Sequence, residues 1–226
     1  IEELRRPVAS LWWSGIAGGI AISVSVLAEG MLHHYLPDTP WKPLIENFGY
    51  CAGFLIVILG RMQLFTENTI TVVIPLLADR SGKLLYRTGR LWTVVLFANL
   101  CGTFCMALAS MYGGIVQPEH LAAMLDISHH LMAYGAAESL LYGIPAGFLV
   151  AAIVWMMPSA HFAAFWVIVF VTYTIALGGF THVVAGSNEV FLLILNGDIG
   201  IARGLLGMLL PTLAGNIIGG TFLFSL

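Results

Sequence analysis

Long apolar runs alternate along the chain with short polar segments. The apolar runs cover residues 11–31, 48–77, 91–112, 136–157, 163–195 and 204–226. An α-helix needs about 20 mostly apolar residues to cross the hydrocarbon core of a bilayer. Each run is long enough, so the pattern predicts an all-α membrane protein with six transmembrane helices.

Polar residues interrupt two of the six runs. The second run contains GRMQLFTENTI (60–70), which places Arg61, Glu67 and Asn68 among apolar residues. The fifth contains GGFTHVVAGSNEVF (178–191), with His182 and Glu189. Non-helical backbone at membrane depth is tolerated only where it is buried in protein or lines a water-filled cavity. We therefore expect the second and fifth helices to be broken, with the two breaks facing each other across an internal cavity.

A faint repeat relates the first three spans to the last three. GIAGGIAI from Gly15 resembles GIPAGFLV from Gly143, and ANLCG from Ala98 resembles GNIIG from Gly215. Because three is an odd number, the two halves would cross the membrane in opposite directions. Such inverted repeats place interrupted helices near the membrane midplane at the transport site. The prediction is one transmembrane domain, 1–226, with repeat halves of about 1–113 and 130–226.

Composition agrees with a membrane protein and disfavours other classes. The chain is 59% hydrophobic and 9% charged, with a mean hydropathy of +0.92. Its net charge of −3 lacks the basic excess expected of a nucleic-acid-binding protein. The three cysteines lie inside apolar runs, which indicates packing and not a disulfide framework. The histidines of the 113–135 loop match no metal-binding spacing, so neither a metal nor a cofactor is expected.

The distribution of basic residues predicts the orientation. Lysine and arginine concentrate on the cytoplasmic side of membrane proteins. Between them, the loops after the first and third runs contain only Lys42. We therefore expect a multi-pass inner-membrane protein with both termini in the cytoplasm. The basic residues that define this side are Arg5, Arg6, Arg80, Lys83, Arg87 and Arg90.

Three motifs on these spans resemble one known family. LFTENT (64–69) resembles the LFT-containing loop of the formate/nitrite transporter family, and GFTHVVAGS (179–187) resembles its histidine loop. GNIIGG (215–220) in the last span and the Asn99–Gly102 pair in the third fit the same family. The resemblance implies an aquaporin-like protomer assembled as a homopentamer. Each protomer would have its own pore for small monovalent anions of weak acids.

The resemblance also assigns residues to the pore. Thr66 corresponds to the family's central threonine and His182 to its central histidine. One hydrophobic constriction maps to Leu64 and Phe65 with Val150 opposite. The second maps to Tyr50, Phe54 and Ile175. Helix packing is the role expected for Asn99, Gly102, Asn216 and Gly219.

The chain departs from the family pattern at several positions. Gly186 stands where the family has an asparagine after the histidine, and Leu131 is closest to the place of an expected lysine. Arg61 and Glu189 are additional charges, and Glu67 replaces a small or neutral residue. Intramembrane charges usually pair with one another. Arg61, Glu67, Asn68 and Glu189 are therefore candidates for polar groups of the lumen. For Arg61 and Glu67 two roles stay open, an ion pair with each other that fixes the loop and direct contact with the substrate. For Glu189 we expect a partner on a neighbouring protomer or on backbone.

His182 is the residue expected to handle a proton, because imidazole exchanges one near neutral pH. A bare anion loses much of its hydration energy in a narrow apolar pore. A proton from His182 would convert the anion into a neutral acid that passes Leu64 and Phe65. The alternative is a buried histidine whose hydrogen bonds are satisfied by carbonyl groups.

The function expected from these features is a channel or transporter for small monovalent weak-acid anions, formate-like or nitrite-like, with a proton relay at the central histidine. A neutral-solute pore like an aquaporin is one alternative. A membrane-embedded enzyme or a regulatory protein without flux is another. Ser187 and His182 lie five residues apart in one loop, without the arrangement of a serine hydrolase, so an enzyme is not expected.

Overall fold

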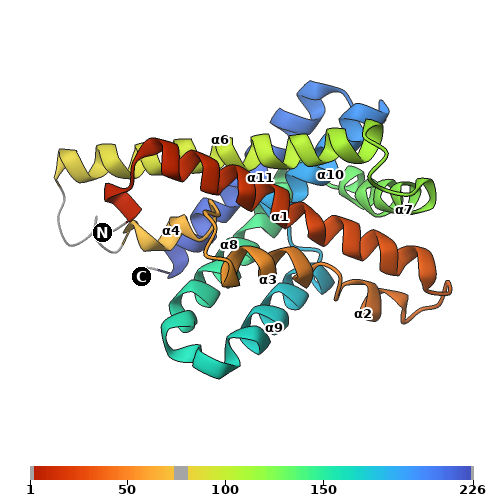
Figure 1. Cartoon of the computed structure of the whole chain (residues 1–226), viewed down its shortest axis with the longest axis horizontal. Helices are drawn as coiled ribbons and strands as arrows, with labels where there is room; N and C mark the ends of the chain where they lie inside the picture. Colours follow the sequence, from red (N-terminus) through yellow and green to blue (C-terminus); the bar gives the residue numbers. More distant parts are fainter. Residues whose placement is uncertain (1–2, 74–80, 225–226) are drawn as a thin grey trace.

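The computed structural model describes residues 3–73 and 81–224 (Figure 1). These residues form helices and loops and contain no β-strand, which confirms the all-α prediction. The α-helices are α1 (Val8–Tyr35), α2 (Lys42–Glu46), α3 (Cys51–Leu59), α4 (Asn68–Thr71), α6 (Gly82–Tyr112), α7 (Pro118–His129), α8 (Ala136–Ala160), α9 (Ala164–Leu177), α10 (Val183–Asn196) and α11 (Leu210–Ile217). Short 3₁₀ turns are η1 (Glu3–Arg5), η2 (His130–Ala133) and η3 (His161–Ala163), and π-helical turns η4 (Arg203–Leu209) and η5 (Ile218–Leu223) flank α11.

The described residues contain five helical segments long and apolar enough to cross a membrane. They are Val8–Tyr35, Lys42–Leu59, Gly82–Tyr112, Ala136–Leu177 and Arg203–Leu223. The count differs from six because Ala136–Leu177, in which α8 and α9 are joined by a turn at His161 with φ of 41°, counts as one segment, and the apolar helix α10 is too short alone. A six-span arrangement therefore stays a prediction. Residues 74–77 of the second predicted run, Arg80 and residues 225–226 lie outside the described part.

The second and fifth predicted spans are both interrupted. The backbone leaves helical geometry between α3 and α4, and again between α9 and α10. Both breaks begin with the same turn, in which Met62 N–H donates to Val57 C=O and Phe180 N–H donates to Ile175 C=O. The residue before each donor has a left-handed backbone, with φ of 51° at Arg61 and 62° at Gly179. Glycine adopts this conformation freely, whereas arginine is strained in it.

Two asparagines hold the two breaks in place with matching hydrogen bonds. Asn99 Oδ1 accepts from Phe65 N–H at 2.9 Å, and its Nδ2 donates to the carbonyls of Gly15 and Gln63, both at 2.8 Å. Asn216 makes the same set in the other half of the chain. Its Oδ1 accepts from Val183 N–H at 2.8 Å, and its Nδ2 donates to the carbonyls of Gly143 at 2.8 Å and Thr181 at 2.9 Å. These matched bonds agree with the predicted repeat, while its inverted orientation in a bilayer stays a prediction.

Small residues let the helices that carry these asparagines approach their neighbours closely. A side chain at Gly102 of α6 would collide with the Ile16 carbonyl of α1, and one at Gly219 would collide with the Ile144 carbonyl of α8. Both glycines were predicted to pack helices together. The contacts show that each sits where only hydrogen separates two helix backbones, which brings Asn99 and Asn216 within reach of the breaks.

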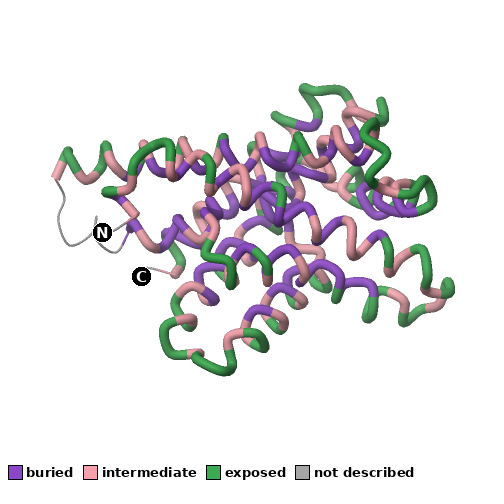
Figure 2. The backbone as a smooth tube through the Cα atoms, viewed as in Figure 1, coloured by how far each residue is buried: buried purple, intermediate pink, exposed green. Residues whose placement is uncertain are grey.

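The protein is elongated, and its two ends differ. Both described termini lie at the same end of the molecule as the start of α6, while α7 and the tip of α2 lie at the other (Figure 1). Buried residues concentrate in the middle, around the two breaks, and exposed ones at the ends and outer faces (Figure 2). The shared end for both termini is compatible with the predicted topology, and their cytoplasmic location stays a prediction.

Candidate functional site

The two breaks meet at a contact between Thr66 and His182. Thr66 Oγ1 lies 2.7 Å from His182 Nε2. Thr66 is fully buried and His182 is 2% exposed. The chain positions differ by more than a hundred residues, so the contact exists only because Asn99 and Asn216 fix the backbone on either side. Sequence analysis placed both residues in the pore, and the structure brings them together.

The other nitrogen of His182 is already occupied. His182 precedes α10, and its Nδ1 accepts a hydrogen bond from Ala185 N–H at 3.2 Å, capping that helix. An imidazole whose Nδ1 accepts carries its proton on Nε2 when neutral. The Nε2–H therefore donates to Thr66 Oγ1, which leaves the threonine hydroxyl hydrogen free to donate elsewhere. A second proton on Nδ1 would displace the cap.

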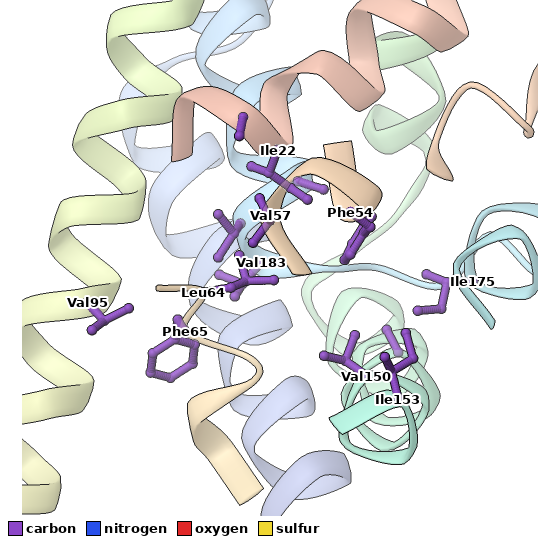
Figure 3. Close-up of a cluster of buried hydrophobic side chains, with 14 of the residues drawn as sticks. Ile22, Phe54, Val57, Leu64, Phe65, Val95, Val150, Ile153, Ile175 and Val183 are labelled. Atoms are coloured by element: carbon purple, nitrogen blue, oxygen red, sulfur yellow. The ribbon is translucent and has the colours of Figure 1, made fainter. Parts of the chain in front are cut away.

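Apolar side chains surround this pair. The ring of Phe54 stands edge-on to the imidazole of His182, with centroids 5.1 Å apart, and Tyr50 contacts Phe54 in turn at 5.2 Å. Leu64 and Val183 belong to the two asparagine-bound breaks, and Val150 and Ile153 reach the same cluster from α8 (Figure 3). Such a setting lowers the local dielectric, so the hydrogen bonds of the few polar groups in it are stronger than in bulk water.

The predicted constriction residues all belong to this cluster. Leu64, Phe65, Val150, Tyr50, Phe54 and Ile175 are each at most 8% exposed. Phe65 contacts Trp92 of α6, with centroids 5.9 Å apart, so it packs toward α6 as well as against the loop. Burial in one cluster is compatible with a narrow pore, and the assignment of these residues to two constrictions stays a prediction.

A cavity of about 310 Å³ reaches His182 from the α7 end of the molecule. We call it the α7-side cavity. Its polar lining residues include Glu29, Glu46, Tyr50, His130, His182 and Glu189. Among its described lining residues there is neither lysine nor arginine. Glu29 lies in the first apolar run, and the lone carboxylate there is the signal by which sequence reasoning could have placed it at the site.

Contacts between histidine and carboxylate side chains hold α7 in place beside this cavity. His33 of α1 lies 2.9 Å from Asp126 of α7, and His129 of α7 lies 2.9 Å from Asp198 beyond α10. Hydrogen bonds from Asn196 and from His129 hold the pKa of Asp198 below its ordinary value. These two contacts, one from a histidine of α1 and one from a histidine of α7, tie α7 to its neighbours.

The expected Arg61–Glu67 ion pair is wrong. Arg61 is exposed on the protomer, and no ion pair within the described residues joins it to Glu67. Arg61 stands in the left-handed turn at the start of the break with its side chain exposed, whereas Glu67 is at the far end of the same loop, next to α4. Glu67 instead lies within electrostatic range of Glu3, and its Oε1 is enclosed with no hydrogen-bond partner in the described part of the chain.

The loop is fixed by amides where the ion pair was expected. Gln63 Nε2 donates to Glu3 at 2.7 Å, and its Oε1 accepts from Asn68 Nδ2 at 3.0 Å. Arg6 pairs with Glu3 at 3.2 Å. Asn68, predicted as a lumen candidate, is 4% exposed and serves this network. Sequence reasoning missed Gln63, whose partners come from the far N-terminal turn.

Glu67→Gln is expected to raise the melting temperature by about 2–4 °C, which corresponds to about 1 kcal/mol for a chain of this size. The change removes a carboxylate that has an unpartnered oxygen and a negatively charged neighbour. Differential scanning fluorimetry in detergent measures it, with Glu119→Gln on the exposed face of α7 as the matched control. A lower melting temperature for Glu67→Gln alone would mean that the carboxylate has a stabilising partner.

Comparisons with known proteins agree with this geometry. The family model described as formate/nitrite transporter matches residues 1–226. The inner membrane protein YfdC of Escherichia coli (strain K12) is 42% identical over 225 residues, covering 100% of this chain and 73% of that protein. The formate-nitrite transporter of Plasmodium malariae is 25% identical over 222 residues, covering 92% of this chain and 70% of that protein.

Solved structures share the fold. A pentameric formate channel with formate bound superposes with a TM-score of 0.80 at 23% identity, covering 94% of this chain and 92% of that one. A second structure, an FNT family ion channel, gives a TM-score of 0.76 at 21% identity, covering 94% and 86%. The match of the family model to the whole chain, joined to the two helix breaks and the threonine–histidine contact between them, places this chain in the formate/nitrite transporter family of membrane channels and transporters.

Proposed function

We propose that the protein conducts small monovalent weak-acid anions, with formate and nitrite as the first candidates, across the inner membrane. The observation that carries the proposal is the Thr66–His182 contact, buried between two helix breaks at the inner end of the α7-side cavity. A family whose members are named for formate and nitrite supports the same substrate class.

Thr66 would be the group that first meets the anion. Because His182 Nε2–H donates to Thr66 Oγ1, the threonine hydroxyl is polarised and its hydrogen points to another acceptor. Hydrogen bonds to charged groups are roughly twice as strong as neutral ones. An anion that has shed its water beside Leu64 and Phe65 would accept this hydrogen bond as a partial replacement for hydration.

A proton relay at His182 has a structural condition. The imidazole becomes cationic only if Nδ1 takes a proton, and Nδ1 accepts from Ala185 N–H. Protonation thus requires the first turn of α10 to release its cap. An anion beside Thr66 would favour the imidazolium by its charge. We propose that the relay operates only with substrate present, and that the empty site holds neutral imidazole.

The assembly would be a homopentamer, because the structural neighbour that superposes best of the two described is a pentameric channel. Large exposed apolar side chains on the outer faces, such as Trp155, Phe170 and Phe222, suit lipid or neighbouring protomers. Both termini would lie in the cytoplasm, as the basic residues indicate.

A neutral-solute pore is the second candidate, and one observation favours it. Carboxylates and no lysine or arginine line the described α7-side cavity, so a free anion entering there meets negative charge. A solute without charge would not. Both candidates use the same path, and they differ in what the path admits.

Purified protein in liposomes distinguishes the candidates. We expect saturable uptake of formate or nitrite above that of protein-free liposomes, with urea and glycerol excluded. Stopped-flow measurement over a panel of formate, nitrite, acetate, lactate, hydrosulfide, urea and glycerol is the assay. Uptake of urea or glycerol alone would replace the anion proposal with the neutral-solute one.

A further inference from the structure

Two carboxylates of the α7-side cavity have no partner. Glu29 projects from α1 and Glu189 from α10, and both line the cavity within electrostatic range of each other. Neither side chain makes a hydrogen bond or ion pair with any described residue. Glu46, the third carboxylate of the cavity, differs because it lies 3.0 Å from His33 Nδ1. The backbone partner expected for Glu189 is therefore not found among residues 3–73 and 81–224.

The hydroxyl group of Tyr50 is a third polar group that lines this cavity, and it is a separate observation from the two carboxylates. Tyr50 is only 8% exposed, and it lines the cavity with its hydroxyl within electrostatic range of Glu29 and Glu189. The described residues provide no hydrogen-bond partner for that hydroxyl. Buried polar groups in native proteins are nearly always hydrogen-bonded, so the water or ligand that fills the cavity has to supply the partner of this hydroxyl.

The donors and acceptors of these three side chains determine which kind of ligand could form hydrogen bonds with all of them. Ionised carboxylates only accept hydrogen bonds, and tyrosine can accept one more. A small anion brings only acceptors and negative charge, and would gain nothing from Glu29 or Glu189 in their ionised form. A cation with several N–H donors complements all three groups. The aromatic faces of Tyr50 and Phe180, which also line the cavity, suit such a cation further.

We infer that the α7-side cavity is a binding site for a small ammonium-type cation, held by Glu29, Glu189 and Tyr50. A volume of about 310 Å³ holds such an ion with part of its water, since one water occupies roughly 30 Å³. Bound there, the cation neutralises the carboxylates on the path to His182. This consequence for anion entry rests on the proposed function, whereas the binding itself does not.

Equilibrium dialysis of radiolabelled methylammonium against the detergent-purified assembly tests the site. Wild type should bind saturably, and Glu29→Gln and Glu189→Gln should each weaken binding by about tenfold or more, because a charge-assisted hydrogen bond is lost. Tyr50→Phe should weaken it by a smaller factor and keeps the test valid if a glutamate variant does not fold. Glu119→Gln, which removes an exposed carboxylate of α7 outside the cavity, is the control and should bind as wild type does.

Absence of saturable binding to wild type at millimolar methylammonium would overturn the inference. So would equal binding by wild type, the two glutamate variants and Tyr50→Phe. Formate uptake by the same preparations separates the two proposals. Formate uptake without methylammonium binding contradicts the cation site alone, and methylammonium binding without any anion uptake contradicts the proposed function alone.

Discussion

Asn99→Ala is expected to lower the free energy of unfolding by about 3–5 kcal/mol, and Asn216→Ala by a similar amount. Each asparagine satisfies one backbone N–H and two backbone carbonyls with bonds of 2.8–2.9 Å. Leaving a buried donor or acceptor unpaired costs about 1–3 kcal/mol. The Gly15 and Gly143 carbonyls belong to helices and keep other partners, so the loop groups dominate the loss.

The hydrogen bonds to the two breaks should contribute more to stability than side-chain hydrogen bonds between membrane helices usually do. Interhelical side-chain hydrogen bonds measured in one membrane protein average only about 0.6 kcal/mol, since the unfolded state in the bilayer finds substitutes. Phe65 N–H and Val183 N–H belong instead to irregular backbone at the centre of the fold. Irregular backbone at that depth has neither helix nor water to replace a lost partner.

Thermal unfolding in detergent, followed by tryptophan fluorescence, measures both variants against Asn196→Ala. Asn196 is an exposed asparagine with one hydrogen bond to Asp198 and provides the matched control. We expect the two core variants to melt far below wild type and the control to melt close to it. Melting temperatures of Asn99→Ala and Asn216→Ala within a degree or two of the control would show that the breaks are held by other contacts.

His182→Phe is expected to reduce anion uptake by about 10- to 100-fold, the range that follows from losing a hydrogen bond to a charged group. The change removes the donor to Thr66 and with it the polarisation of the threonine hydroxyl. It also removes the cap on Ala185 N–H, which costs about 1 kcal/mol of stability. Native mass spectrometry should still show five copies, so that lost uptake is not lost assembly.

Thr66→Val tests the contribution of the threonine hydroxyl separately from that of the His182 imidazole. Valine keeps the shape of threonine and leaves His182 in place, so reduced uptake would come from the missing hydroxyl hydrogen alone. Thr174→Val is the matched control, because the hydroxyl of Thr174 is exposed on α9 and bonds only its own helix at Phe170 C=O.

Much of the fold was predictable because it follows from local patterns. Apolar run lengths predicted most of the helices, and polar residues inside two runs predicted the breaks between α3 and α4 and between α9 and α10. The number of spans was less predictable. The runs 136–157 and 163–195 were predicted as separate spans, and the chain does turn between α8 and α9 at His161, but α9 and α10 have only 14 residues each, so the fifth span depends on how the two meet across the break.

The site was predictable where a motif carried it and less so elsewhere. Thr66 and His182 came from motifs, and their contact depends on Asn99 and Asn216, whose roles need three-dimensional partners. Charge pairing was predicted by proximity in sequence, which failed for Arg61 and Glu67 because they stand at opposite ends of the loop and Arg61 is exposed. Glu29 belongs to none of the motifs, and its neighbours in the cavity, Tyr50 and Glu189, come from other parts of the chain.

The central claim is that anions cross the protein along a path on which they meet Thr66 and His182. Formate uptake into proteoliposomes between pH 5 and pH 8 tests this claim most directly. Wild type and His182→Phe, reconstituted as intact assemblies at equal density, are compared over the whole range. The account predicts saturable, pH-dependent uptake by wild type and uptake lower by about 10- to 100-fold, without that pH dependence, by the variant. The same rate and the same pH profile in both proteins would contradict it, and would make His182 a residue that only caps α10.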